Sequence, residues 1–268
     1  MTYKLIAIDI DDTLLTSAKT ISSQTKAQIR LALERNIKVV LCSGRPHKAM
    51  YKYAQQLGIY GTNQYMITNG GAIIENLNSD IIFQNTLPNI FYHYFVDFVD
   101  KNSLSYCVFD VNGNVYTSNH SDIDPFTIAM AFENGDGLHI RNPEEMPSNF
   151  EITKAVINGD EEKINRITNF IKAEFSDYFV VRTGIGYLEI FPNDVNKGIA
   201  LKHLANHLNI SLSDIIAFGD RDNDIPLLET AGLGIAMKNA TVGTKAVCDY
   251  ITTDNNHDGV GKALAKFV

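Results

Sequence analysis

The stretch Leu5-Ile6-Ala7-Ile8-Asp9-Ile10-Asp11-Asp12-Thr13 decides the fold. Its first four residues form a short continuous apolar run, which is typical of a strand buried on both faces of a parallel sheet. Carboxylates follow at once, and ligand sites in open α/β sheets lie at the carboxyl ends of the strands. Crowded carboxylates repel one another unless a cation neutralises them, and their oxygens suit Mg²⁺. The stretch therefore predicts an α/β fold with a metal site after its first strand.

The same pattern, a buried strand followed by polar residues, recurs in two other places. Ile37 to Cys42 is such a strand and stops at Ser43-Gly44-Arg45, and Ile215 to Phe218 is another that stops at Gly219-Asp220. Helical patterns separate the strands, with Ser22 and Ser23 as candidate caps of a helix that ends at about Glu34. Strands and helices that alternate at this spacing predict βαβ units around a parallel sheet.

The middle of the chain has a different pattern. Asn112-Gly113 is a hairpin signal, and a strand pair surrounds Gly184 and Gly186. Hairpins combined with helices predict an antiparallel sheet in an α+β unit. We therefore expect one α/β domain in two pieces, residues 1–83 and 190–268, with an α+β domain, residues 84–189, inserted between them.

The composition is that of an ordinary globular protein. Of 268 residues, 45% are hydrophobic and 20% are charged, and 23 basic against 31 acidic residues give a formal net charge of −8. An acidic balance argues against non-specific binding to nucleic acid or to an anionic membrane. No apolar run approaches the ~20 residues of a membrane span, and the three cysteines form no CxxC pair. We expect a soluble cytoplasmic protein.

Four segments at strand ends or helix starts carry the groups that phosphoryl transfer needs. The segments are Asp9-x-Asp11, Ser43-Gly44-Arg45, Lys197-Gly198 and Gly219-Asp220-Arg221-Asp222-Asn223-Asp224. They supply two carboxylate pairs, a hydroxyl beside N–H groups at a helix N-terminus, and a lone ammonium. Either acidic segment taken alone could be a solvated turn. The four together favour a metal, a cation and a nucleophilic acid at one site, which is the equipment for phosphoryl transfer.

These segments resemble motifs one to four of the haloacid dehalogenase superfamily. Their order, their spacing and the position of the insert are similar to the Cof-type branch, which carries a class IIB cap. Asn69-Gly70-Gly71-Ala72 and Asp258-Gly259-Val260 also resemble segments of that branch. The resemblance covers nearly the whole chain. It implies a Rossmann-like parallel-sheet core, residues 1–83 and 190–268, that carries out catalysis, and a cap, residues 84–189, that determines substrate specificity.

The resemblance also implies roles for the carboxylates. Asp9 would attack phosphorus and form an aspartyl-phosphate. Asp11 would protonate the leaving alkoxide and then take a proton from the hydrolytic water. Mg²⁺ would be held by Asp9, by the backbone carbonyl of Asp11 and by Asp220. Asp224 would act through a water or through the other ligands.

The transferring phosphoryl group has its own implied partners. Ser43, the Gly44 N–H and Lys197 would hold its oxygens. Asn223 would orient Lys197, Asp220 or the phosphate. Arg45 is either structural or a substrate contact, and the sequence leaves both open.

Two residues depart from the family pattern. Asp12 stands where the Cof-type branch usually has glycine. Arg221 is a cation inside the fourth motif, and the pattern does not fix its direction.

We therefore expect a Mg²⁺-dependent phosphatase that hydrolyses small cytosolic phosphomonoesters, sugar phosphates first. Its partner would be a small phosphorylated metabolite, with no nucleic acid, membrane or obligate protein partner. Two alternatives stay open: a phosphotransferase or phosphomutase that uses the same intermediate, and a phospho-acceptor or ligand-binding regulatory module of low turnover. Release of inorganic phosphate without a bisphosphate activator would favour the hydrolase.

Overall fold

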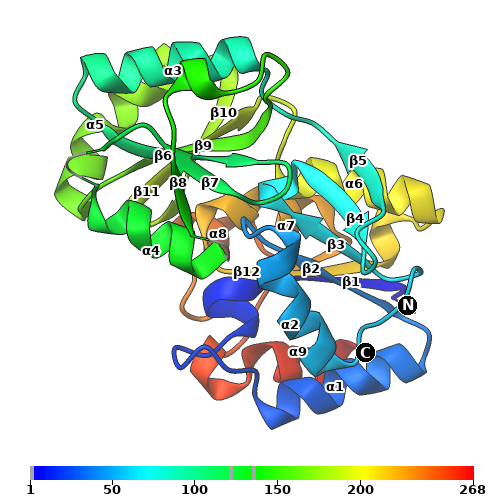
Figure 1. Cartoon of the computed structure of the whole chain (residues 1–268). Helices are drawn as coiled ribbons and strands as arrows, with labels where there is room; N and C mark the ends of the chain where they lie inside the picture. Colours follow the sequence, from blue (N-terminus) through cyan, green and yellow to red (C-terminus); the bar gives the residue numbers. More distant parts are fainter. Residues whose placement is uncertain (1–2, 121–122, 135–136) are drawn as a thin grey trace. The chain divides into compact units, whose positions relative to one another are not determined.

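The computed structural model describes residues 3–120, 123–134 and 137–268 (Figure 1). The chain divides into two compact units, one made of Met1–Phe83 and Asn196–Val268 and the other of Gln84–Val195. No helix within the described ranges combines the length and the hydrophobicity that crossing a bilayer requires.

The first unit is built on an eight-stranded sheet with the order β14-β13-β12-β1-β2-β3-β4-β5. The central strand β1 (Leu5–Asp9) lies between β2 (Lys38–Cys42) and β12 (Ile215–Gly219) and is parallel to both. The other strands are β3 (Tyr65–Thr68), β4 (Ile73–Asn76), β5 (Ile81–Gln84), β13 (Leu233–Ala236) and β14 (Tyr250–Ile251). The strands from β14 to β3 in this order are all parallel to their neighbours, and β4 is antiparallel to β3. The predicted parallel-sheet α/β core is therefore confirmed.

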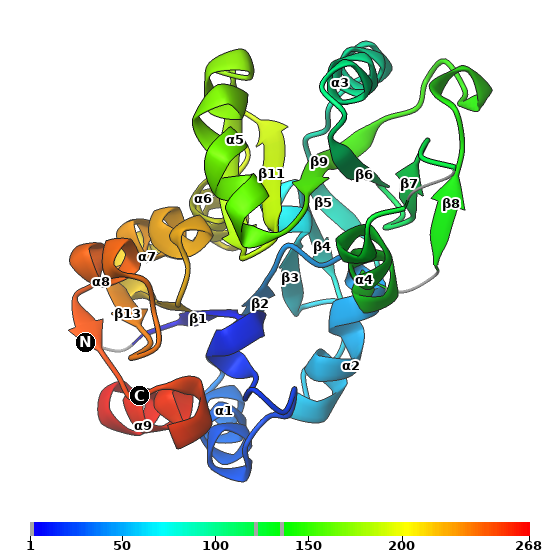
Figure 2. The same cartoon turned by 90° about the vertical axis from the view of Figure 1, so that its left-hand side faces the viewer.

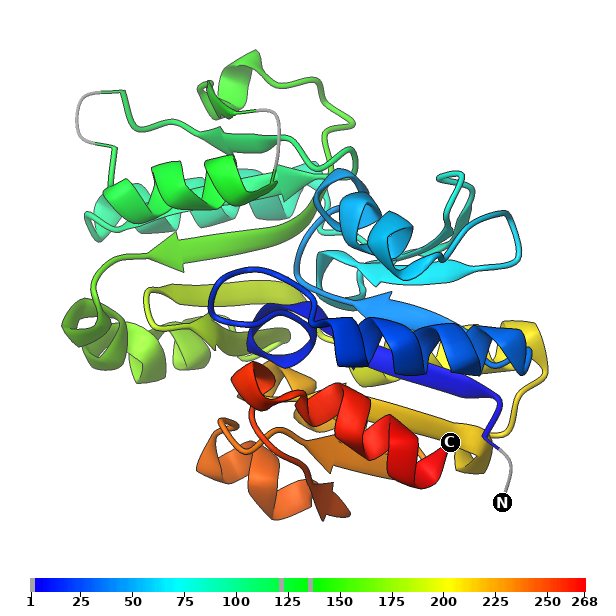
Figure 3. The same ribbon diagram turned by 90° about the horizontal axis from the view of Figure 1, so that it is seen from below.

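Helices cover both faces of this sheet, which is why β1 is a continuous apolar run. Ile6 and Ile8 pack with α1 (Ser23–Glu34), α2 (His47–Leu57) and α9 (Gly259–Phe267). Leu5 and Ala7 pack on the opposite face with α6 (Lys197–Leu208) and α7 (Ile225–Thr230). A further helix, α8 (Val242–Val247), lies beside α7 (Figure 2), and α1 and α9 lie side by side (Figure 3). Alternate residues of one strand therefore belong to two different cores.

The predicted cap at the start of α1 is confirmed. The Ser22 side chain accepts a hydrogen bond of 3.1 Å from the Thr25 N–H, as an N-cap does, and the helix ends at Glu34. Short helical turns complete the described elements of the unit. They are the π-helical turn η1 (Ile10–Leu14) and the 3₁₀ turns η2 (Asn69–Gly71), η4 (Leu212–Asp214), η5 (Asp222–Asp224) and η6 (Asn255–His257).

The second unit has a six-stranded sheet with the order β10-β11-β9-β6-β7-β8. The strands are β6 (Ser105–Asp110), β7 (Val115–Thr117), β8 (Leu138–Ile140), β9 (Ile152–Asn158), β10 (Tyr178–Gly184) and β11 (Tyr187–Pro192). Their pairings are antiparallel except that of β7 with β8. One face packs with α3 (Asn89–Lys101) and α5 (Glu161–Glu174), and the other with α4 (Pro125–Asn134); η3 (Pro143–Glu145) precedes β9. This is the α+β insert that the hairpin signals predict.

The second unit ends later along the chain than the sequence suggested. The expected boundary was 189/190, whereas the chain returns to the first unit between Val195 and Asn196. The reason is the pairing of β11, which aligns Ile190 with Ala155 of β9 and Pro192 with Tyr178 of β10. The pairing of β11 with β9 ends at Ile190, but its pairing with β10 continues to Pro192 and keeps the strand in the second unit to its last residue.

Candidate active site

The turn after β1 places three carboxylates in different directions. Asp9 ends the strand and is buried, with a relative exposure of 6%. Asp11 and Asp12 interrupt η1 with non-helical backbone, and Asp12 has a φ of 57°. That left-handed conformation suits glycine and is tolerated by aspartate, which accounts for Asp12 at a position where the Cof-type branch usually has glycine.

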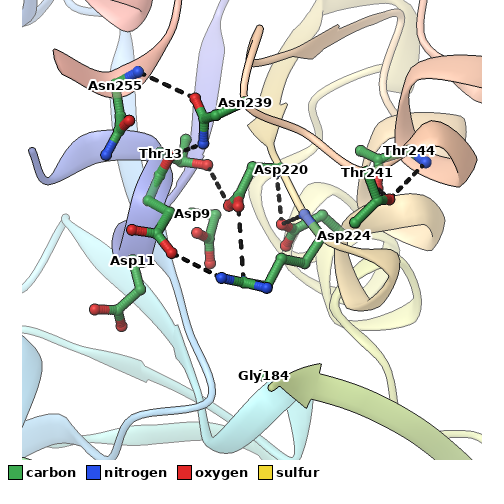
Figure 4. Close-up of polar contacts among 12 residues, drawn as sticks. Asp9, Asp11, Thr13, Gly184, Asp220, Asp224, Asn239, Thr241, Thr244 and Asn255 are labelled. Carbon is green, nitrogen blue, oxygen red and sulfur yellow. Dashed lines mark hydrogen bonds and ion pairs between the residues drawn. The ribbon is translucent and has the colours of Figure 1, made fainter. Parts of the chain in front are cut away.

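The acidic segments after β1 and β12 converge. Because β1 and β12 are parallel neighbours with Ile8 opposite Phe218, both segments begin at the same edge of the sheet. Asp9, Asp220 and Asp224 each offer a carboxylate oxygen, and these oxygens lie within 4.8 Å of one another (Figure 4). All three residues are buried.

Lys197, the first residue of α6, lies inside this cluster. Its Nζ donates hydrogen bonds to Asp9 Oδ1 at 2.5 Å and to Asp224 Oδ1 at 2.6 Å. Burial disfavours the charged ammonium, but the charges of Asp224 and Asp9 outweigh burial and raise the pKa of Lys197. The lysine is therefore a fixed positive charge that orients the Asp9 carboxylate.

Two glycines allow the start of α6 to approach its neighbours. A Cβ on Gly198 would lie 2.2 Å from the carbonyl oxygen of Pro226, at the beginning of α7. A Cβ on Gly71, which has a φ of 108°, would lie 2.5 Å from the carbonyl oxygen of Asn196. The Asn69–Gly71 segment thus supports the helix that carries Lys197.

Asp224 is fully engaged within the protein. One of its oxygens accepts from Lys197, and Oδ2 accepts from the backbone N–H groups of Asp220 at 2.9 Å and Arg221 at 3.2 Å. These contacts make Asp224 a residue that orients Lys197 and the loop after β12. Asp9 and Asp220 are left as the side chains of the cluster that can bind a cation.

The charges of the cluster fit a divalent cation. Burial and the charge of Asp224 raise the pKa of Asp220 to about 7, and the same two causes raise the pKa of Asp9. Asp220 Oδ1 accepts a hydrogen bond of 2.9 Å from Thr13 Oγ1. Three buried carboxylates thus lie together, and only two of them, Asp9 and Asp224, contact the Lys197 ammonium. Oxygen donors with an excess of negative charge are what Mg²⁺ requires.

Asp11 does not join this cluster through its side chain. Arg45 binds the carboxylate with two donors, Nε at 2.7 Å from Oδ2 and Nη2 at 2.9 Å from Oδ1, and Lys19 Nζ lies 3.0 Å from Oδ1. Burial alone would raise the pKa of Asp11, but the hydrogen bonds and charges of Arg45 and Lys19 outweigh burial and lower it to about 2. The structure thereby gives Arg45 a partner, and it adds Lys19, for which the sequence carried no signal.

Ser43 and Gly44 follow β2, whose last residue, Cys42, lies opposite Asp9. Ser43 is buried, and its Oγ accepts a hydrogen bond of 3.2 Å from the Arg45 N–H. The carbonyl oxygen of Ser43 accepts from the Gly70 N–H at 2.9 Å, so the Asn69–Gly71 segment also fixes this turn. The residues predicted to bind phosphate therefore start from the strand next to β1.

Asn223 lies in η5, between Asp222 and Asp224. Its side-chain oxygen Oδ1 is buried and has no hydrogen-bond partner among the described residues. A buried amide oxygen without a partner is costly, and a bound ligand or water would satisfy it.

A cavity of about 290 Å³ lies beside Asp220. Its walls are polar and include Asp12, Asp220, Arg221, Asn239, Thr241 and Asn255. Figure 4 shows four of these side chains near the segments that follow β1 and β12: Asp220, Asn239, Thr241 and Asn255. Of the three clustered carboxylates, that of Asp220 lines this cavity.

Comparisons with known proteins agree with this architecture. The model of the haloacid dehalogenase-like hydrolase family matches residues 6–264. The Bacillus subtilis protein YxeH is 30% identical over 270 residues, which cover 99% of this chain and 98% of the relative. The 5-amino-6-(5-phospho-D-ribitylamino)uracil phosphatase YitU of Bacillus subtilis is 27% identical over 270 residues, covering 98% of this chain and 97% of the relative. A solved structure of a subclass IIB sugar phosphatase of the superfamily is similar in fold, with a TM-score of 0.84, 24% identity and 98% of each chain covered.

The family match spans almost the whole chain, and the fold is that of a solved structure of subclass IIB. The chain therefore belongs to the haloacid dehalogenase-like hydrolase family, and it is a hydrolase of phosphoric monoesters.

Proposed function

We propose that this hydrolase depends on Mg²⁺ and acts on small phosphorylated metabolites, with sugar phosphates as its preferred substrates. The reaction forms an aspartyl-phosphate on Asp9 as an intermediate. The observation that carries the proposal is the buried Asp9 carboxylate at the end of β1, held by Lys197 at 2.5 Å and close to Asp220. A buried, oriented carboxylate beside a fixed cation is suited to attack an anionic phosphate.

The reaction that we propose has two halves. An oxygen of Asp9 forms a bond to phosphorus while the bond from phosphorus to the substrate oxygen breaks, and the leaving alkoxide takes a proton from Asp11. The oxygen of a water then forms a bond to phosphorus while the bond from phosphorus to the Asp9 oxygen breaks, and the water gives a proton to Asp11. Inorganic phosphate leaves, and the Asp9 carboxylate is regenerated. Since Arg45 and Lys19 hold Asp11 ionised, its carboxyl group must separate from them before it carries a proton.

The metal ligands in this proposal are the carboxylates of Asp9 and Asp220 and the backbone carbonyl of Asp11. Mg²⁺ bound there supplies positive charge that offsets the repulsion between the nucleophile and the phosphate. Asp224 stays outside the ligand set because both of its oxygens already accept hydrogen bonds from the protein.

In this proposal the phosphate is bound by four residues: Ser43, Gly44, Lys197 and Asn223. Lys197 provides the charge, and the Ser43 hydroxyl and the Gly44 N–H start from the strand next to β1. Asn223 would donate from its Nδ2 to a phosphate oxygen, and its partnerless Oδ1 would accept from a bound water or a substrate hydroxyl. We assign catalysis to the first unit and substrate specificity to the second.

The substrate class rests on the similarity to YitU, which is named as a phosphatase of a phosphorylated ribityl compound. A phosphate at the end of a hydroxylated carbon chain is the group that such a compound shares with sugar phosphates. This supports a small, hydroxyl-rich phosphomonoester as the substrate.

The test is a screen for phosphate release over hexose and pentose phosphates, nucleotides, pyridoxal phosphate and flavin mononucleotide, with and without Mg²⁺. Sugar phosphates should be hydrolysed fastest, EDTA should abolish the activity, and Asp9→Asn should be inactive. Near-normal activity of Asp9→Asn would refute the nucleophile, and faster hydrolysis of nucleotides than of every sugar phosphate would refute the substrate class.

A further inference from the structure

An ion pair links the two segments that supply the proposed metal ligands. The Arg221 Nη2 donates a hydrogen bond of 2.9 Å to Asp12 Oδ2, while the Arg221 Nε lies 3.8 Å from Asp220 Oδ2. Asp12 follows β1 and Arg221 follows β12, so the pair spans the same edge of the sheet as the Asp9–Asp220 site. Both side chains are 35% exposed and also border the cavity beside Asp220.

Asp12 is held in place independently of Arg221. Its carbonyl oxygen accepts a hydrogen bond of 2.8 Å from Asn239 Nδ2, and Asn239 Oδ1 in turn accepts from the Asn255 N–H at 3.1 Å. These hydrogen bonds fix the backbone at Asp12 and so restrict the positions that its carboxylate can reach. Arg221, which has a long flexible side chain, is thus restrained by Asp12 and not the reverse.

The charges of Arg221 and Asp12 have opposite effects on a cation bound at the Asp9–Asp220 site. A guanidinium is always charged, and this one lies near a carboxylate that would bind Mg²⁺, so it repels the ion and competes for Asp220. The Asp12 carboxylate neutralises that charge and holds the Nη2 of Arg221 at 2.9 Å, which leaves only the longer contact of 3.8 Å between Nε and Asp220 Oδ2. The net effect depends on both members of the pair.

We propose that the Asp12–Arg221 pair sets the affinity of the Asp9–Asp220 site for divalent cations: Arg221 weakens cation binding, and Asp12 limits that weakening. The inference rests on the proposed function, because it takes Mg²⁺ as the cation of the site. It makes both residues positioning residues for the metal, in contact with neither substrate nor phosphate.

The chain contains a matched control pair. Lys4 and Asp214 form an ion pair of 2.7 Å directly before β1 and β12, at the other ends of the same two strands. Five residues of strand separate the two ends by roughly 17 Å, which exceeds the Debye length of about 8 Å at physiological ionic strength. Lys4→Gln therefore removes one positive charge from the protein without altering the field at the metal site.

The experiment titrates Mg²⁺ into the full-length protein without substrate, by calorimetry, at pH 7.5 and physiological ionic strength. Arg221→Gln should bind Mg²⁺ about tenfold more tightly and Asp12→Asn about tenfold more weakly, for one unit charge near a divalent ion at a partly exposed position. The double variant should lie close to the wild type, and Lys4→Gln should equal it. Asparagine is chosen at Asp12 because it tolerates the left-handed backbone there.

The direction of the change separates this inference from a structural role. Unfolding temperatures measured on the same samples report stability, and a pair that serves only stability would lower them and weaken Mg²⁺ binding in both single variants. Such a common direction, or an Arg221→Gln affinity equal to that of the wild type, would overturn the inference. If Arg221→Gln fails to fold, Arg221→Lys replaces it: this variant keeps the charge and should match the wild type, while Asp12→Asn must still weaken binding.

Different experimental results would overturn this inference and the proposed function. Hydrolysis by the wild type together with single variants that shift in the same direction would overturn the inference alone. The expected affinities without any hydrolysis of phosphomonoesters would support the inference and overturn the proposed function. A wild-type protein that does not bind Mg²⁺ would overturn both.

Discussion

Replacement of Lys197 by methionine should destabilise the protein strongly. The side chain is 1% exposed, and its ammonium lies 2.5 Å from Asp9 Oδ1 and 2.6 Å from Asp224 Oδ1. Methionine keeps the length of the side chain but leaves two buried carboxylates without their shared cation. Breaking a buried ion pair on one side costs about 3–5 kcal/mol, which is a large part of a typical total stability of about 5–15 kcal/mol.

A double-mutant cycle assigns this cost to the cluster. In the Asp224→Asn background one of the two stranded charges is already gone, so Lys197→Met should cost about 2 kcal/mol less than it does in the wild type. The free energy of unfolding is measured in urea without Mg²⁺, by far-ultraviolet circular dichroism, because the chain has no tryptophan. Lys202→Met, at an exposed position on the same helix, is the matched control and should change stability by less than about 0.5 kcal/mol.

Strict additivity of the two substitutions would refute the reasoning. It would mean that Lys197 stabilises the fold through packing of its aliphatic chain and not through its charge. A cost of less than about 1 kcal/mol for Lys197→Met would refute it as well, because that is below the cost of a buried unpaired charge.

Three further predictions concern the same site. Arg45→Gln removes the bidentate partner of Asp11, so the pKa of Asp11 should rise from about 2 toward its ordinary value. A carboxyl group whose pKa is lowered in the folded protein stabilises the fold at any pH above its pKa in the unfolded chain, and this contribution is lost as the pH falls toward the lower, folded-state pKa. Unfolding measured as a function of pH should therefore show that the variant is less stable than the wild type near pH 7 and approaches it as the pH falls from about 4 to 2. A stability difference between Arg45→Gln and the wild type that is constant over this range would contradict the ion pair. Gly198→Ala should lower activity at least about tenfold, because its Cβ would meet the Pro226 carbonyl oxygen at 2.2 Å and displace Lys197, whereas unchanged kcat would show that α6 can shift freely. Ca²⁺ in place of Mg²⁺ should bind but support little turnover, since its larger and looser coordination shell misplaces Asp9, and equal turnover with both ions would argue against the proposed ligands.

The sequence predicts those parts of the fold that depend on neighbours along the chain. The apolar run Leu5 to Ile8 indicates a doubly buried strand because burial on both faces leaves no position for a polar residue. Ser22 is recognisable as a cap because a cap needs only a hydroxyl before the first helical turn. By contrast, the second unit extends to Val195 because β11 stays paired with β10 as far as Pro192, and composition does not reveal which strands pair.

The candidate site, too, has parts that the sequence predicts and parts that it does not. The acidic segments could be located because each directly follows a buried strand, and β1 and β12 prove to be neighbours. The contacts of Asp11 with Arg45 and of Asp12 with Arg221 join residues that are 34 and 209 positions apart. Their partners depend on side-chain directions within the folded turn, and no local pattern encodes those directions.

The central claim is that Asp9 becomes phosphorylated during turnover. The direct measurement is intact-protein and peptide mass spectrometry of the enzyme quenched in acid during hydrolysis of a phosphomonoester that it turns over. The account predicts one added phosphoryl group, located on Asp9 and absent from Asp9→Asn. Steady hydrolysis with the phosphoryl group on another residue, or with none on the protein at any time before product appears, would contradict it.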